Sequence, residues 1–529
     1  MRKTSKSAAV VKALLFIFLA VTVVCPLIAM LFTMAEVDIG AVLGSSMFLQ
    51  ATLNSFVVTL TATIFSILLA LILAWCLSRS RIKHKNILAV LLTVPMLIPS
   101  ISHGMGLVIL LGSNGILTNL LHLPFDIYGF WGIVIGSILY SFPVAFLMLL
   151  DIFQYEDYTP YESAQVLGIP KWNQFTSITL PYLRKPMISV FFATFTLIFT
   201  DYGVPLMVGG KYQTLPMYMY NEVIGQSDFG RGTVVALVLI TPALVAFLFD
   251  LFNKDVGNMS FVSRAFQVRP SRARDILCLC ITILVIILVI LPIVAFVFLT
   301  FVTKYPLDMS LSLENIFQAM DLNALGYLGN SLVIAVITSL VGVAVAYITA
   351  TFTSRIKSKS SSLLHLISIL TLAIPGLVLG LSYALFFQKS FIYGTITILI
   401  LVNSIHFFAS PYLMAYNALG KINPNFEPVA KTLGIKRWRL IKDVFLPQTW
   451  GTILEMFSYF FVNCMITISA VSFLSNSDNT PIAMMIPQFE AQMLLECSAF
   501  VSLLILIINI IIKIGVYLGK KVCKKRNLA

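Results

Sequence analysis

Residues 276–303 have the sequence ILCLCITILVIILVILPIVAFVFLTFVT, which contains no charged side chain. A helix needs about 20 apolar residues to cross the hydrocarbon core of a bilayer, so this segment is long enough to span one. The whole chain has the same character, because 59% of its 529 residues are hydrophobic and 11% are charged. A soluble domain carries about 25% charged residues. The sequence therefore predicts an all-α polytopic membrane protein with lipid as its solvent.

Other apolar segments of similar length bring the predicted number of spans to about twelve. The spans are residues 11–34, 54–77, 87–112, 127–153, 187–208, 233–253, 276–303, 330–352, 363–388, 393–419, 453–474 and 498–519. The first apolar run is longer than the core of a signal peptide, which has about 7–15 residues, so we expect a retained span.

The lysines and arginines predict how these spans are oriented. With the N-terminus in the cytoplasm, 30 of the 35 basic residues fall in cytoplasmic segments. The loops on the other side hold four, namely Lys211, Arg231, Lys304 and Lys389. Cytoplasmic loops of membrane proteins carry such an excess of basic residues, so both termini are expected inside. The same placement explains the net charge of +13 without nucleic acid as a partner.

Several absences limit the function. The seven cysteines form no C-x-x-C pair, so no disulfide framework and no metal site are expected. The chain has no G-x-x-x-x-G-K-[ST] phosphate loop, and no predicted loop is long enough for a nucleotide-binding domain. No nucleophile with a nearby base suggests an enzyme. We therefore expect a transport subunit without catalytic residues. The nucleotide hydrolysis that drives transport is then carried out by a separate chain.

The sequence repeats itself in two alignments. The first alignment pairs Asn54-Ser55, Arg79, Pro99 and Gly104 with Asn330-Ser331, Arg355, Pro375 and Gly380. The second, in a slightly different register, pairs Leu167-Gly168-Ile169, Trp172 and Leu180-Pro181 with Leu433-Gly434-Ile435, Trp438 and Leu446-Pro447. The expected domains are two parallel six-span halves, 1–253 and 276–529, joined by a basic cytoplasmic linker, 254–275. Such a duplication implies a pseudo-twofold axis along the membrane normal, with a pathway between the halves.

Two cytoplasmic loops, 154–186 and 420–452, occupy equivalent places between the fourth and fifth spans of each half. In each, an acid and small residues open a short helix, a glycine suited to a helix end follows, and an amphipathic stretch leads to Leu-Pro. The candidate residues are Glu162, Ala164, Gly168, Leu180 and Pro181 in the first loop and Glu427, Ala430, Gly434, Leu446 and Pro447 in the second. The pattern predicts a helix–turn–helix that lies flat on the inner side of the membrane.

These loops resemble the EAA loop of binding-protein-dependent ABC importer permeases of the MetI-like, type I family. The resemblance covers nearly the whole chain, as a fused tandem form. It implies that each loop supplies a coupling helix for one ATPase subunit, so that two copies bind one chain. It also implies an extracytoplasmic binding protein, no cofactor in this chain because ATP is bound by a separate subunit, and a multi-pass location in the bacterial inner membrane. The sequence departs from the pattern at Ser163, and at Pro428, where the acid stands one residue earlier.

Polar residues inside the predicted spans are candidates for the translocation pathway. Asp201 falls within the fifth span, where an acid costs about 2.5–3.5 kcal/mol on insertion scales. Its repeat partner is Thr467. Asn403, Ser404, His406 and Asn463 lie in late spans, where each could instead hydrogen-bond between helices. Asp201 could also lie at the outer mouth, if Gly203 and Pro205 end the helix there. The motifs Gly132-x-x-x-Gly136 and Gly376-x-x-x-Gly380 are expected to serve close helix packing.

The substrate is expected to be a small solute. In its size and fused form, this chain resembles the permeases for ferric iron, thiamine and 2-aminoethylphosphonate. Residues 200–205, 208–212 and 221–226 look most like the 2-aminoethylphosphonate group, so a phosphonate is the expectation, with ferric iron or thiamine as the alternative. In a different class, a secondary transporter of the major-facilitator type also has twelve spans in two parallel halves. It would not need paired loops after its fourth and tenth spans.

The charge distribution generates a prediction about topology. Reporter fusions placed after Asn253 and after Ala529 should both report a cytoplasmic location, because both positions follow an even number of spans. The measurement is the activity of a reporter that works on only one side of the membrane. An external signal from either fusion would overturn the predicted orientation.

Overall fold

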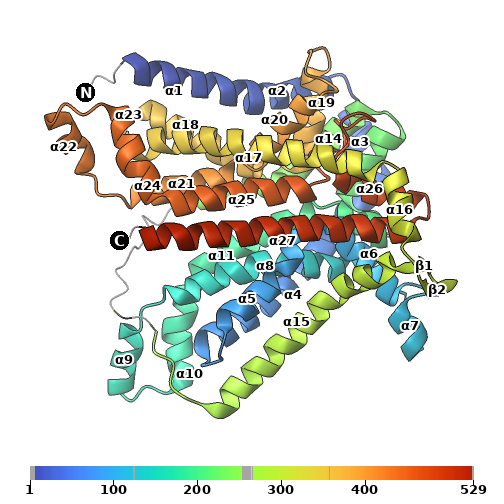
Figure 1. Ribbon diagram of the computed structural model, residues 1–529, viewed down its shortest axis with the longest axis horizontal. Coiled ribbons are helices and arrows are strands. Elements are labelled where there is room, and N and C mark those ends of the chain that lie inside the picture. The colour runs from blue at the N-terminus through green and yellow to red at the C-terminus, as the bar shows by residue number, and fades with distance from the viewer. Residues whose placement is uncertain (1–5, 123–125, 253–263, 265, 357, 527–529) are drawn as a thin grey trace. The chain divides into compact units, whose positions relative to one another are not determined.

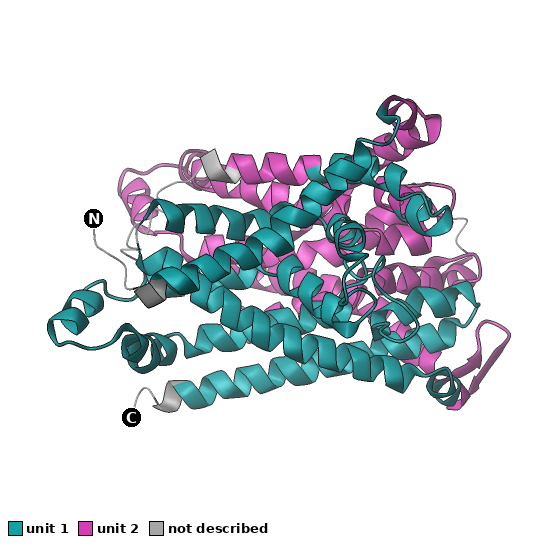
Figure 2. Cartoon of the chain, turned by 90° about the horizontal axis from the view of Figure 1, so that it is seen from above, with its two compact units in different colours: residues 1–39, 220–240, 316–529 teal, residues 40–219, 241–315 magenta. Residues whose placement is uncertain are grey.

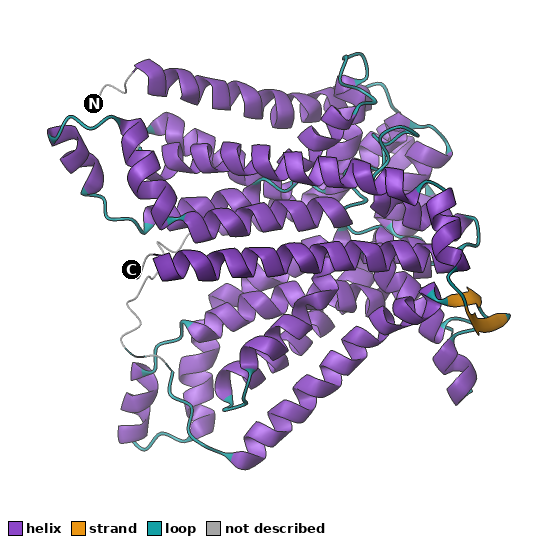
Figure 3. Cartoon of the chain, viewed as in Figure 1, coloured by secondary structure: helices purple, strands orange, loops and turns teal. Residues whose placement is uncertain are grey.

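The computed structural model describes residues 6–122, 126–252, 264, 266–356 and 358–526. Helices dominate these residues (Figures 1 and 3), as expected for an all-α membrane protein. The described residues also contain one short antiparallel hairpin, which consists of β1 (Val302–Lys304) and β2 (Asp308–Leu311).

The structure differs from the predicted count of twelve spans. Among the described residues, nine helices are long and apolar enough to cross a membrane, and two bent pairs raise the number to eleven. The pairs bend by 109° between Lys359–Ala373 and Gly376–Phe387 and by 51° between Ile396–His406 and Ala409–Gly420. The predicted span 453–474 corresponds to α25 (Trp450–Ile466), which has 17 residues because the chain leaves the helix at Thr467.

The chain forms two compact units (Figure 2). Unit 2 comprises residues 40–219 and 241–315. Its helices are α4 (Ser46–Arg79), α5 (Lys85–Thr93), η2 (Val94–Leu97), α6 (Ser100–Leu111), α7 (Ile116–Leu121), α8 (Phe130–Gln154), α9 (Thr159–Val166), α10 (Lys171–Gln174), η3 (Phe175–Thr179), α11 (Leu180–Phe199), α12 (Gly203–Val208) and α15 (Arg272–Thr300). Its buried core joins α4, α8 and α15 through Leu73, Phe146 and Val289.

Unit 1 comprises residues 1–39, 220–240 and 316–529. Its helices are α1 (Lys6–Leu19), η1 (Ala20–Val24), α2 (Cys25–Met34), η4 (Asn221–Gly225), α17 (Ala324–Arg355), α18 (Lys359–Leu370), η5 (Thr371–Ala373), α19 (Gly376–Phe387), α20 (Ile396–His406), α21 (Ala409–Gly420), α22 (Phe426–Thr432), α23 (Arg437–Leu440), η6 (Ile441–Phe445), α24 (Leu446–Gln448), α25, η7 (Ile482–Met484), α26 (Met485–Ala491) and α27 (Leu495–Arg526). The unit boundaries fall within or beside α3 (Ile39–Leu43), α13 (Leu215–Tyr220), α14 (Phe229–Phe252) and α16 (Glu314–Asp321).

The compact units do not follow the two sequence halves, because the first span of each half packs with the other half. Helices α1 and α2 belong to unit 1, where the Tyr383 hydroxyl of α19 donates to the Thr22 carbonyl over 2.7 Å. The Lys12 ammonium also donates to Ser358, Ser360 and Ser361, which are 2.7–2.9 Å away. Conversely, α15 belongs to unit 2 and packs on α4 and α6. The predicted halves and linker stay a prediction, and linker residues 254–263 and 265 lie outside the described residues.

The repeated proline interrupts the third span in both halves. Pro99 precedes α6 and Pro375 precedes α19, both with extended backbone (φ −58°, ψ 149° and φ −60°, ψ 147°). Proline fixes φ and has no N–H to donate, so the helix before it ends and a new one begins. The matching residues found in the sequence therefore mark a matching break.

The repeated Asn-Ser pair binds the segment that follows the fifth span. In unit 2, the Asn54 amide donates to the Gln213 carbonyl over 3.0 Å, and the Ser55 hydroxyl accepts from the Leu215 N–H over 2.6 Å. In unit 1, the Asn330 amide donates to the Asp478 carbonyl over 3.1 Å, and Ser331 accepts from the Ile482 N–H over 2.7 Å. These side chains satisfy loop carbonyls and the free N–H groups at the start of α13 and η7, which explains why both halves carry them.

The repeated Gly104 and Gly380 allow helices α6 and α19 to approach equivalent segments of the two halves. A Cβ atom on Gly104 would lie 3.3 Å from the Val204 carbonyl oxygen, and one on Gly380 would lie 2.7 Å from the Ala470 carbonyl oxygen. Val204 and Ala470 are themselves paired by the second repeat alignment, the one that pairs Gly168 with Gly434. The predicted packing role of Gly132-x-x-x-Gly136 is confirmed too, since a Cβ on Gly136 would lie 2.6 Å from the Val204 side chain.

Candidate functional site

The first candidate loop is a short helix that ends in a left-handed glycine turn. Helix α9 is followed by Gly168, whose φ is +68°. The Ile169 N–H donates to the Ala164 carbonyl over 2.9 Å, and the Gly168 N–H donates to the Gln165 carbonyl over 3.1 Å. This pair of bonds defines a Schellman motif, in which glycine supplies the left-handed residue. The chain then enters α10, a π-helical turn (η3) and α11, which begins with Leu180-Pro181.

The second candidate loop has the same geometry. Helix α22 is followed by Gly434 with a φ of +67°. The Ile435 N–H donates to the Ala430 carbonyl over 2.8 Å, and the Gly434 N–H donates to the Lys431 carbonyl over 3.2 Å. Helix α23, a π-helical turn (η6) and α24 with Leu446-Pro447 follow. The left-handed conformation expected from the two glycines is confirmed.

Both loops present exposed apolar side chains around the turn. In the first loop the exposed fractions are 88% for Val166, 75% for Leu167 and 71% for Trp172. In the second they are 53% for Val429, 67% for Leu433 and 68% for Trp438. Leu167 and Leu433, like the two tryptophans, are repeat equivalents. Exposed apolar residues that gather on one feature are typical of an interaction surface.

The two acids do not occupy equivalent environments. Glu162 forms an ion pair with Arg264 from the linker, and both side chains are partly exposed. Glu427 accepts two hydrogen bonds from the Arg355 guanidinium, over 2.5 and 2.6 Å, in an arrangement where Arg355 is 5% exposed. Glu427, which stands one residue earlier than Glu162 in the repeat alignment, is thus bound at the end of α17. The sequence showed that the second acid stands one residue earlier than the pattern requires, but it gave no role to Arg264 or to Arg355 as its partner.

The residue that corresponds to Arg355 in the first half has another partner. Arg79 forms a buried ion pair with Glu156, which follows α8. The Tyr161 hydroxyl also donates to Glu156 and lies 2.6 Å from the Thr179 hydroxyl. Burial raises the pKa of Tyr161, so the neutral phenol is the form that donates. The repeated arginines marked the duplication in the sequence, but nothing there indicated these partners.

Asp201 lies in a break between two helices, whereas the sequence predicted a span over residues 187–208, with the alternative that Gly203 and Pro205 end the helix near Asp201. Helix α11 ends at Phe199, and α12 begins at Gly203. The Asp201 carboxylate accepts a hydrogen bond from the Val204 N–H over 3.0 Å. Aspartate commonly satisfies a free N–H at the start of a helix in this way. Asp201 also lines a small cavity within unit 2 together with Ser55, Thr59 and Ser137. Its role in the pathway stays a prediction.

The other polar candidates lie on or beside two helices of unit 1. The Asn403 amide donates to the Leu399 carbonyl over 2.9 Å, and the Asn463 amide donates to the Tyr459 carbonyl over 2.7 Å. Each bond lies within the residue's own helix, α20 for Asn403 and α25 for Asn463. Interhelical bonds had been considered for these two residues, and the hydrogen bonds that their amide groups donate here are of the other kind. A polar side chain in apolar surroundings can be satisfied locally by the carbonyl one turn earlier.

The remaining pathway candidates are His406, Ser404 and Thr467. A Cβ on Gly376 would lie 3.1 Å from the His406 ring and 2.3 Å from the Ser469 hydroxyl, so α19, α20 and the chain after Thr467 meet there. Thr467 is buried at the end of α25. The structure thus brings His406 close to the segment that begins at Thr467, while leaving the Ser404 hydroxyl and His406 Nδ1 without a partner among the described residues.

A family comparison identifies the chain. The sequence pattern of the family described as "Binding-protein-dependent transport system inner membrane component" matches residues 66–256 and 342–519. Together the two segments make up most of the chain, and the first repeat alignment pairs their starting positions, 66 and 342. The chain belongs to this family of importer permeases. The permease is of the MetI-like ABC type in a fused tandem form, as the motifs of loops 154–186 and 420–452 indicated.

Individual relatives agree with this assignment. The permease is 26% identical over 500 residues to the ferric transport system permease protein FbpB of Actinobacillus pleuropneumoniae, a match that covers 88% of this chain and 71% of the relative. It is 26% identical over 403 residues to the thiamine transport system permease protein ThiP of Haemophilus influenzae, with 73% of each chain covered. The molybdenum transport system permease protein ModB of Escherichia coli matches 37% of this chain but 87% of its own length, at 26% identity. A segment of less than half this chain therefore matches nearly a whole relative.

The capping geometry generates a prediction for Asp201. Replacing it with Asn should keep the bond to Val204, because Asn caps helices as well as Asp does, while Asp201→Ala should cost about 1 kcal/mol of stability. If the charge serves transport, Asp201→Asn lowers uptake without lowering the thermal midpoint in detergent. Uptake and thermal unfolding at matched expression are the measurements. Normal uptake by Asp201→Asn would restrict the residue to its capping role.

Proposed function

We propose that this permease subunit of an ABC importer binds two ATPase subunits, one at each of the loops 154–186 and 420–452. The observation that carries this proposal is the pair of matching Schellman turns, each surrounded by exposed apolar side chains, at equivalent positions of a duplicated chain. ATP is bound by the separate subunits, and an extracytoplasmic binding protein delivers the solute. Both loops and both termini face the cytoplasm, in accordance with the distribution of basic residues.

The connection from the first loop to the membrane supports a mechanical role. Helix α10, the π-helical turn and α11 form one apolar helical stretch from Lys171 to Phe199. A movement of the turn at Gly168 therefore acts on one end of a helical stretch whose other end lies beside Asp201. In the second loop the helix is interrupted at Thr449 before α25 begins. Rigid-body movement of a docked helix is a common way to transmit a switch into packed helices.

The solute is the finer part of the proposal. We infer that ferric iron is the substrate class best supported, because the ferric relative is matched over more of this chain than the thiamine relative is. The relatives described above give no support to a phosphonate, which the sequence alone had favoured. Thiamine is the alternative.

The substrate can be tested with the reconstituted importer. We expect ferric iron, presented by the cognate binding protein, to stimulate ATP hydrolysis in proteoliposomes and to be taken up. Thiamine and 2-aminoethylphosphonate serve as parallel arms with the same binding protein. Stimulation and uptake with either of these, and not with ferric iron, would replace the proposed substrate.

The docking role predicts the effect of blocking the left-handed turns. Gly168→Val and Gly434→Val should each strain the backbone by about 1–3 kcal/mol, because both residues have positive φ. An added Cβ meets no atom within 4 Å at either site, so the permease itself should still fold. We expect weaker ATPase association or hydrolysis without uptake, measured by co-purification and transport.

Gly515→Val is the matched control, because Gly515 lies in α27, outside both loops, and an added Cβ there also meets open space. This variant should bind ATPase and transport normally. If the Gly168→Val/Gly434→Val double variant still binds two ATPase subunits and transports at the normal rate, the docking role of the loops is wrong.

A further inference from the structure

The linker between the halves lies against the first coupling loop, and its contacts begin with the backbone. The Tyr158 N–H donates to the Arg264 carbonyl over 3.0 Å, and the Arg264 N–H donates to the Asp157 carboxylate over 3.2 Å. Asp157 and Tyr158 directly precede α9. The linker is thus paired with the chain at the start of the coupling helix.

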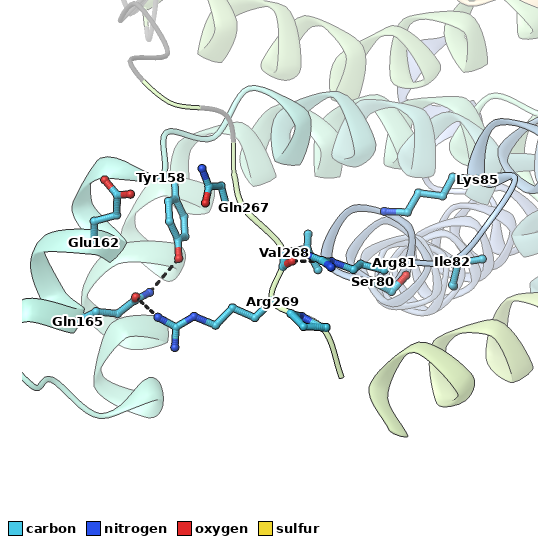
Figure 4. Close-up of a pocket in the computed structure, with 11 residues that line it drawn as sticks. Ser80, Arg81, Ile82, Lys85, Tyr158, Glu162, Gln165, Gln267, Val268 and Arg269 are labelled. Carbon is cyan, nitrogen blue, oxygen red and sulfur yellow. Dashed lines mark hydrogen bonds between the residues drawn. The ribbon is translucent and has the colours of Figure 1, made fainter. Parts of the chain in front are cut away.

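Side chains extend this attachment along α9, as Figure 4 shows. The Arg269 guanidinium donates to the Gln165 side chain over 2.5 Å, and Gln165 in turn donates to the Tyr158 hydroxyl over 3.0 Å. On the opposite side, Arg81 donates through Nε to the Val268 carbonyl over 2.8 Å. The linker therefore bridges α9 and the end of α4, and these residues line a cleft of about 590 Å³.

Phe266 lies at the centre of the attachment. Its ring makes edge-on contacts with Tyr158 and Tyr161 of the first loop, with centroids 5.0 and 5.2 Å apart. The Arg79 guanidinium lies over the same ring, 3.3 Å from its centroid. Arg79 is held by Glu156, so Phe266 joins α9 to a buried ion pair at the base of the loop.

The relative strength of these interactions shows which residue contributes most to holding the linker against α9. The Arg264–Glu162 pair is exposed, with Arg264 at 60%, and exposed ion pairs contribute little to stability. Aromatic pairs and a cation–π contact with a buried arginine are stronger. Phe266 is therefore the main anchor, and Arg264 and Arg269 set the direction of the segment.

The second coupling loop obtains its support in another way. Its acid, Glu427, is bound by Arg355 of the preceding long helix α17, and the same guanidinium donates to the Leu419 and Ile422 carbonyls over 3.1 and 2.8 Å. In the first half the equivalent arginine is occupied by Glu156, so the acid of α9 is met by Arg264 instead.

We propose that linker residues 264 and 266–269 form a brace for the first coupling loop, with Phe266 as its principal positioning residue. This inference rests on the proposed docking of ATPase at that loop. The linker that covalently connects the halves thus also holds α9 in position, whereas α22 is held by Arg355 of its own half.

The brace can be tested by amide hydrogen exchange on the intact permease in nanodiscs, without ATPase. Phe266→Ala should raise the exchange rate of α9 amides by about fivefold to tenfold, through loss of the aromatic and cation–π contacts. Exchange of α22 amides should stay unchanged and provides an internal reference. Phe266→Tyr keeps the aromatic ring, so its α9 amides should exchange as slowly as those of the unchanged permease. A general loss of stability caused by any substitution at this position would speed exchange in both variants.

Arg272→Gln is the matched control, since Arg272 is an exposed basic residue just after the brace. It should leave α9 exchange unchanged. Unchanged α9 exchange in Phe266→Ala, or equal acceleration in α9 and α22, would overturn the brace.

Adding ATPase separates this inference from the proposed function. Faster α9 exchange together with weaker coupling of hydrolysis to uptake would support both. Faster α9 exchange with normal ATPase binding and uptake would support the brace and count against docking at the first loop.

Discussion

Each backbone group that lipid surrounds must find a hydrogen-bond partner within the protein, and this requirement shapes the whole structure. Continuous helices meet it by themselves. Where a span is broken, other groups of the protein have to supply the partner, and at several breaks these are side chains. Asp201 does so for the N–H of Val204, and the Asn-Ser pairs at 54–55 and 330–331 do so for the segments after the fifth span of each half. These polar residues therefore provide hydrogen-bond partners for backbone groups at the places where the spans are interrupted.

The sequence predicted the fold well where its signal was long and periodic. Apolar runs and two repeat alignments were sufficient for helical spans, a duplication and a pair of matching turns. It failed at the ends of helices, because local exceptions decide them. The bend at Pro375 and the early end of α25 at Thr467 reduce the count of full spans, and Asp201 lies in a gap that hydropathy passes over.

The candidate site could be predicted only as far as the chain carries local patterns. The Gly168 and Gly434 turns follow from a glycine after a short helix, and the structure has both. The partners of Glu162 and Glu427 come from residues 102 and 72 positions away, and no local pattern specifies them. The two acids have different partners because Arg79, the equivalent of Arg355, is already paired with Glu156. Asn403 and Asn463 show the opposite case, since a partner one turn earlier on the same helix satisfies each amide group.

The first span of each half packs with the other half, and this arrangement has a consequence for biosynthesis. All residues of unit 2 lie between positions 40 and 315, so this unit can be completed while the ribosome is still making the rest of the chain. Helices α1 and α2 emerge first, yet a helix they pack against, α19, begins only at Gly376. At about 5–20 residues per second, the first span spends tens of seconds in the membrane before its unit can close. During that interval α2 lacks the packing that α19 later supplies.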